Sequence, residues 1–145
     1  MLDQQHDVML YGISAHGVEL ADRYRDLAGL DTMPPALAQE LQQLADERER
    51  LMDAFRQEVL TEGGLPKAGN PDREFIESLA DRWLSSLNGL RVVFERLQQA
   101  EQVWLDDIVT LSREEWPAPL AELLISLSSH GHRCQERLNW MADHC

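Results

Sequence analysis

The stretch RLQQAEQVWLDDI, residues 96–108, places a carboxylate where a helical bundle usually has an apolar residue. It belongs to a longer run in which core-type positions recur at alternating steps of four and three, the spacing of a helix that packs in a bundle. Ten of the eleven positions are apolar, and Glu101 is the exception. Since a buried carboxylate is costly without a partner, the pattern predicts a buried helix in which Glu101 is paired. The positions are Ile76, Ala80, Trp83, Leu87, Leu90, Phe94, Leu97, Glu101, Trp104, Ile108 and Leu111.

Three breaks rich in glycine and proline divide the chain. They are GLDTMPP at 29–35, TEGGLPKAGNP at 61–71 and SREEWPAP at 112–119. The intervening segments predict helices at about 4–29, 35–62, 72–112 and 118–143, the third of which can kink or divide at Asn88 and Gly89. Four such helices in 145 residues predict an all-α protein, a four-helix bundle that forms one domain over residues 1–145.

The composition is that of a globular, acidic chain. Hydrophobic residues make up 43% of it, and the predominance of leucine and alanine among them favours helix over sheet. A net charge of -13 repels phosphate, which disfavours nucleic acid and anionic membranes as partners. Since no apolar run reaches the roughly 20 residues of a membrane span and the N-terminus lacks signal-peptide features, we expect a cytoplasmic protein. Cys134 and Cys145 are expected to be free thiols, because they lie too far apart along one helix to form a disulfide.

The other predicted helices carry polar residues in or beside their apolar seams. Arg48 interrupts the second seam, His16 lies in the first, and His130 lies beside the fourth. In a helical hairpin, residues equally distant from the loop lie at one level. His16 is therefore level with Arg48, about sixteen residues from the first loop, and Glu101 is level with His130 around the last loop. These four residues form the predicted buried polar cluster.

The connection between residues 62 and 72 decides whether the two levels coincide. A short return places Arg48 opposite Leu87, whereas a crossover that makes the second and third helices parallel places it opposite residue 98, close to Glu101. A nearly extended linker reaches about 36 to 40 Å, which is about the length of a bundle helix. We expect the crossover, and the short return is the alternative.

Three interpretations of the polar cluster are open. Glu101 and Arg48 can form a buried ion pair, with His16 and His130 satisfying the remaining hydrogen bonds. Alternatively, these side chains reach solvent at the edge of the bundle, with the arginine extended along apolar surface. The third interpretation is a metal or catalytic site.

The chain resembles the ferritin-like superfamily, in which carboxylates and histidines project into a four-helix bundle. The resemblance rests on ELADRY at 19–24, ERER at 47–50, AEQVWLDDI at 100–108 and SSHGH at 128–132. The first two are similar to motifs of rubrerythrin-type proteins. The order of the helices and the DRWLSSL stretch at 81–87 are similar to small bacterial ferritin-like bundles.

The resemblance implies the metal-ligand candidates Glu19, Glu47, Glu101 and His130, with iron or zinc as the metal. The sequence departs from the family pattern at Arg50, where a histidine is expected, and at Leu127 and Ser129, where a glutamate is expected. A di-iron centre needs about six protein ligands, so these departures argue against one. We therefore expect no cofactor and a ferritin-like bundle that has lost its metal, with Arg48 at its centre neutralising Glu101.

Other candidate chemistry is sparse. His130, His132 and Cys134, with His144 and Cys145, could be interpreted as a zinc or copper site, but residues 130 and 134 share a helix face that 132 does not. The sequence shows no phosphate-binding loop and no nucleophile with its base at a known spacing. We expect a non-catalytic binding protein or a stress-associated interaction protein, with a protein partner or homodimerisation. The alternative is a metal-binding oxidoreductase or iron-handling protein.

Overall fold

The computed structural model describes residues 4–64 and 89–144, which form four α-helices and no strand. The all-α four-helix bundle is therefore confirmed. Residues 72–88 of the predicted third helix lie outside the described residues, and so does Cys145. The helices are α1 (Gln4–Ala28), α2 (Pro35–Thr61), α4 (Gly89–Ser112) and α5 (Ala118–Asp143).

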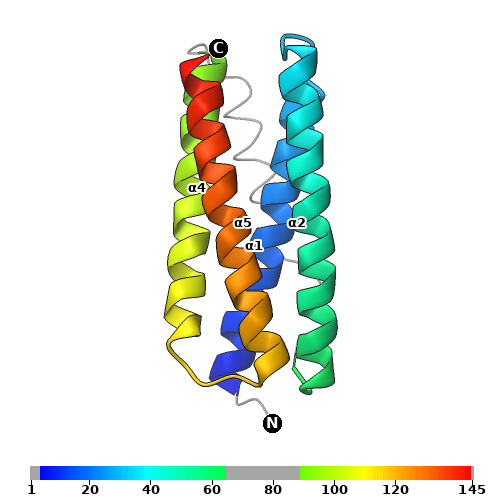
Figure 1. The fold of residues 1–145 in the computed structure, drawn as a ribbon, viewed down its shortest axis with the longest axis vertical. Coiled ribbons are helices and arrows are strands. Elements are labelled where there is room, and N and C mark those ends of the chain that lie inside the picture. The colour runs from blue at the N-terminus through cyan, green and yellow to red at the C-terminus, as the bar shows by residue number, and fades with distance from the viewer. Residues whose placement is uncertain (1–3, 65–88, 145) are drawn as a thin grey trace.

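The helices are arranged as the four corners of a square. α1 packs against α2 and α4, and α5 packs against α4 and α2, so α1 lies diagonally across from α5. In Figure 1, α1 and α5 run upward while α2 and α4 run downward. Each helix is therefore antiparallel to both of its neighbours, and α2 and α4 run in the same direction on opposite corners.

The helix ends follow from proline and glycine. α2 starts after Pro34 with proline in its first turn, and α5 starts after Pro117. Proline suits these positions because its fixed φ matches the helix and its missing N–H needs no partner there. At the end of α2, Gly63 adopts a positive φ of 85°, and the next amide, of Gly64, donates to the Val59 carbonyl at 2.9 Å. This arrangement is a glycine cap of the kind that ends helices.

Two glycines allow the helices to approach the core closely. A Cβ on Gly17 of α1 would lie 2.5 Å from the Met52 sulfur, and one on Gly131 of α5 would lie 2.6 Å from Leu105 Cδ2. Both positions also lie against the ring of Trp104, which is 1% exposed. The apolar seams thus close around this tryptophan at mid-bundle.

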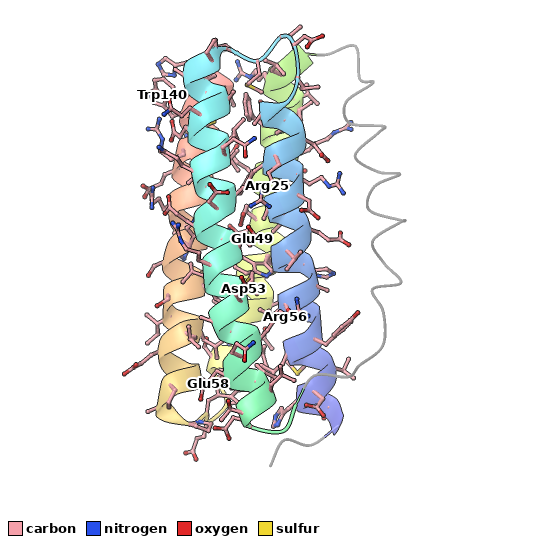
Figure 2. The ribbon with its side chains drawn as sticks, turned by 90° about the vertical axis from the view of Figure 1, so that its right-hand side faces the viewer. Arg25, Glu49, Asp53, Arg56, Glu58 and Trp140 are labelled. Atoms are coloured by element: carbon pink, nitrogen blue, oxygen red, sulfur yellow. The ribbon has the colours of Figure 1, made fainter. Side chains whose placement is uncertain are left out.

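Charged side chains occupy the outside of the bundle. Arg25 of α1 donates to Glu49 of α2 at 2.7 Å, and both lie on the face that these helices form in Figure 2. On the neighbouring side of the bundle, between α2 and α5, Arg137 of α5 forms an ion pair with Glu40 of α2. None of the described helices combines the length and hydropathy that crossing a lipid bilayer requires.

Candidate functional site: a buried arginine and its ligands

Arg48 lies at the centre of the bundle with no solvent exposure. Arg48 lies about one helical turn from Leu44, Ala45 and Met52, which are buried on the inner face of α2. The helix therefore directs the guanidinium of Arg48 into the core. Its Nη2 donates to both carboxylate oxygens of Glu101 of α4, at 2.6 and 2.9 Å. Glu101 is also fully buried, so the pair is shielded from water and from salt screening.

α5 supplies two further ligands of the guanidinium. Arg48 Nε donates to His130 Nδ1 at 3.0 Å. Nη2 also lies 3.6 Å from the Cys134 sulfur, which is a weak acceptor. Because residues 130 and 134 are four apart, they lie on the same helix face and reach the guanidinium together.

Tyr24 of α1 completes the coordination of Glu101. Its hydroxyl donates to Glu101 Oε1 at 2.5 Å, and the side chain is fully buried. Burial and the negative charge of Glu101 raise the pKa of Tyr24 well above its ordinary value, so the phenol keeps its proton and remains a donor. Glu101 Oε1 thus accepts from α1 and α2 at once.

Trp104 forms the floor of the site. It follows Glu101 by three residues on α4, and the guanidinium carbon of Arg48 lies 3.9 Å above its ring centroid. This is a cation–π contact, which is strongest where the cation is removed from water. The indole Nε1 donates to the Ile13 carbonyl at 2.9 Å and fixes the ring against α1.

The charges of Arg48 and Glu101 depend on one another. Burial raises the pKa of Glu101, while the positive charge of Arg48 and the hydrogen bond from Tyr24 oppose the rise. For Arg48, burial is the largest influence and lowers the pKa, but the charges of Glu101, Tyr24 and Cys134 and the hydrogen bond to Glu101 together outweigh it, so the net direction is upward. Removal of either partner would leave the other as a buried charge without compensation.

His130 is held in one tautomer by this network. Since a guanidinium can only donate, Nδ1 of the imidazole must accept, and its proton is carried on Nε2. Burial, followed by the positive charges of Arg48 and Arg133, lowers the pKa of His130 from 6.5 to about 3. The ring is therefore neutral at neutral pH. Its Nε2 lies 3.8 Å from Glu47 Oε2, beyond hydrogen-bond distance.

Acidification should destabilise the folded chain through His130. The unfolded chain binds a proton near pH 6.5 but the folded chain only near pH 3, so the free energy of unfolding falls as the pH drops through this window. Urea unfolding at a series of pH values can compare the wild type with His130→Gln, whose amide can accept from Arg48 but does not titrate. We expect the stability of the wild type relative to the variant to fall on acidification. A difference that is independent of pH would contradict this account.

The structure brings Arg48, Glu101 and His130 of the predicted cluster together. His16 is half-buried, and no hydrogen bond or ion pair among the described residues joins it to them. Tyr24 occupies the α1 position in the cluster instead. The remaining candidates lie elsewhere: Glu47 is at the α2–α5 edge, where Arg133 Nη2 donates to its Oε1 at 3.0 Å, and Glu19 is on a different face of α1.

The candidate ligands do not converge on a common point. Within residues 4–64 and 89–144, no group of three or more histidine, cysteine and acidic side chains is arranged to hold a metal ion. Burial raises the pKa of Cys134 to about 12, so its thiol stays protonated, whereas metals bind the thiolate. His132, of the possible zinc or copper site, is exposed.

The predicted cluster omitted two members that the structure contains. Tyr24 lies seven residues after Gly17 and four after Leu20, so it shares their face of α1, but the predicted seam of that helix included His16 and omitted the tyrosine. The ELADRY motif contained the tyrosine and could have indicated it. Trp104 was placed in the core, but its contact with a cation could be foreseen only once Arg48 was known to lie at the same level.

Comparison of the chain with models of known protein families, with curated proteins and with solved structures gives no match. The fold and the site alone therefore define the class: an all-α four-helix bundle centred on a buried arginine, which is paired with a glutamate and seated on a tryptophan.

Proposed function

We propose that this chain is a non-catalytic, ferritin-like bundle that acts as a binding or stress-associated interaction protein, and that Arg48 occupies the place of a metal centre. One observation carries the proposal. The fully buried guanidinium of Arg48 donates to both the carboxylate and the imidazole that would otherwise be available as ligands.

The charge balance of the centre supports this interpretation. Glu101 supplies one negative charge, Arg48 supplies one positive charge, and His130 is neutral. A divalent cation at this point would stand beside the arginine with one carboxylate to offset three positive charges. Such an excess of buried charge costs several kcal/mol, on the order of the desolvation penalty for each uncompensated ion. A metal could enter only if Arg48 left the centre.

The ferritin-like part of the proposal includes a crossover between α2 and α4. Two observations support it. α2 and α4 run in the same direction in Figure 1, so the end of one lies far from the start of the other. Arg48 lies 13 residues before the end of α2 at Thr61, and Glu101 lies 11 residues before the end of α4 at Ser112, as expected for residues that share a level in parallel helices.

Exposed apolar side chains support the proposed binding role. Large apolar side chains are exposed on every described helix, among them Val8 at 64% and Ile125 at 66%. Trp140 is 42% exposed near the end of α5 (Figure 2). Its ring stacks on His144 and lies under the guanidinium of Arg137. Exposed aromatic residues beside arginine are typical of protein interfaces. We therefore propose a protein partner or a second copy of the chain as the ligand.

Elemental analysis of protein purified without chelator tests the metal-free centre. We expect iron and zinc far below one atom per chain, before and after incubation with either ion and desalting, because Arg48 already satisfies the ligands. Stoichiometric metal that is lost in Glu101→Ala, and retained in the edge variant Glu47→Ala, would establish the alternative of a metal-binding, iron-handling protein.

A further inference from the structure

A small cavity opens between α1 and α4, toward the end of the bundle where α1 begins and α4 finishes (Figure 1). Its volume is about 200 Å³. We call it the α1–α4 pocket. It is distinct from the arginine centre, because no residue that lines it is a described ligand of Arg48 or Glu101. The lining residues in the described chain are Met9, Gly12 and Ile13 of α1 and Asp107, Thr110 and Leu111 of α4.

Gly12 keeps the α1–α4 pocket open. A Cβ at this position would meet no heavy atom of the described chain within 4 Å, whereas one on Gly17 or Gly131 would press on core side chains. The floor of the pocket is apolar, since Ile13 and Leu111 belong to the buried core. An apolar cavity of about 150 Å³ holds a benzene molecule. The pocket therefore has room for a body of that size together with one small polar group.

Two indole hydrogen bonds hold the lining in place. Trp104 Nε1 donates to the Ile13 carbonyl at 2.9 Å and ties this part of α1 to α4. Trp116 Nε1 donates to the Leu111 carbonyl at 2.7 Å and fixes the end of α4. The pocket is therefore largely preformed, and a small ligand can bind it without first ordering the helices around it.

The polar side chains of the α1–α4 pocket are hydrogen-bond acceptors. Asp107 carries a carboxylate, which accepts when it is ionised. The Thr110 hydroxyl already donates to the Asp106 carbonyl at 3.0 Å, so its oxygen is left to accept. Residues 107 and 110 lie on one face of α4, near its C-terminal end, which is the negative end of the helix dipole. These groups suit a ligand that donates hydrogen bonds and carries positive charge.

We propose that the α1–α4 pocket binds a small organic cation, a primary ammonium group on a compact apolar body. The ammonium donates to the Asp107 carboxylate and to the Thr110 oxygen. The body fills the space beside Gly12, against Ile13 and Leu111. An anion is disfavoured by the carboxylate and by the net charge of -13. This small-molecule site goes beyond the protein partner proposed above and does not depend on whether the arginine centre binds metal.

Titration of the isotope-labelled full-length chain with benzylammonium, followed by amide chemical shifts, tests the proposal. We expect saturable shifts at residues 9–13 and 107–111, with a dissociation constant of about 5 mM or tighter. Benzyl alcohol has the same ring without the charge and should bind at least about threefold more weakly. Benzoate carries the opposite charge, and we expect it to cause no saturable shifts in these residues.

Two variants and a matched control test the individual residues. Gly12→Leu places a side chain in the open space and replaces glycine in a helix, so the chain should stay folded while binding weakens at least about tenfold. Asp107→Asn removes only the charge and should weaken benzylammonium binding roughly threefold or more without affecting benzyl alcohol. The control Asp106→Asn makes the same charge change at a residue that accepts from Gln102 at 2.8 Å and does not line the pocket. It should leave binding unchanged.

Several results would overturn the proposal. They are the absence of saturable shifts at about 20 mM benzylammonium, shifts centred on other residues, and equal binding of benzyl alcohol or benzoate. Undiminished binding to a Gly12→Leu chain whose other amide shifts match the wild type would also overturn it. So would an equal loss in Asp106→Asn and Asp107→Asn, because net charge alone would then explain the effect. The comparison of these two asparagine variants remains decisive if Gly12→Leu fails to fold.

Discussion

Replacing Glu101 with leucine should lower the free energy of unfolding by about 3 kcal/mol or more. The substitution leaves the guanidinium of Arg48 fully buried, with His130, Cys134 and the Trp104 ring as its remaining contacts and no anion to balance its charge. It also leaves the hydroxyl of Tyr24 without its acceptor. Chemical unfolding followed by circular dichroism measures the loss.

A second substitution, Arg48→Met, should restore much of the stability that Glu101→Leu removes. Methionine is similar in length to the arginine stem and fills the core without charge, and a well-packed apolar pair can replace a buried ion pair at little cost. Arg48→Met alone should be as harmful as Glu101→Leu alone, because it leaves the carboxylate uncompensated. A double variant as unstable as the sum of the two single variants would contradict the pairing.

Trp104→Ala should cost about 3 to 5 kcal/mol, the range for removing a large aromatic side chain from a core. The indole is 1% exposed, and it contacts α1 through the Ile13 carbonyl and supports Arg48 from below. Gly17 and Gly131 have no side chains with which to fill the space that it would leave. Thermal or chemical unfolding measures the effect.

Two controls separate the contributions of Trp104. Trp104→Phe keeps an aromatic ring near Arg48 but removes the indole N–H donor, and we expect a smaller loss of about 1 to 3 kcal/mol for the unpaired Ile13 carbonyl and the reduced volume. Trp140→Ala removes the same side chain from a position that is 42% exposed. A loss for Trp104→Ala no greater than that for Trp140→Ala would contradict its role as the floor of the site.

The seam of α4 was predictable because nearly all of its described residues are buried in the core of the bundle. A regular run of apolar residues with Glu101 as its exception indicated both the helix and the buried carboxylate. Arg48 and His130 were predictable for a similar reason, since each lies on a helix with a clear seam. Hairpin geometry then related the seams to one another, which is why three of the four predicted cluster residues meet in the structure.

α1 was harder to interpret because it is buried on more than one side. Tyr24 is buried on its core-facing side, while Ala15 and Glu19 are buried on another side, so apolar and polar residues occur on both faces. A pattern of this kind supports several registers, and the one chosen included His16 and passed over Tyr24. No periodicity argument could have corrected it without the position of Glu101 in space.

The family motif was a poor guide to which side chains enter the core. In ERER it indicated Glu47, but that residue lies at the edge of the bundle, where it pairs with Arg133, and its neighbour Arg48 points inward. Consecutive residues of a helix point about 100° apart. A motif that is aligned one residue away from the correct position therefore selects a side chain on a different face of the helix. The interruption of the α2 seam by Arg48 was the more reliable signal.

The coupling energy between Arg48 and Glu101 tests the central claim most directly. A double-mutant cycle with Arg48→Met and Glu101→Leu should give about 2 kcal/mol or more, because the pair is fully buried and its members depend on one another for charge compensation. The same cycle on Arg91 and Glu95, an exposed ion pair on the same helix α4, should give a coupling close to zero. Couplings of equal size at the two pairs would contradict the claim that Arg48 neutralises Glu101 at the centre of this bundle.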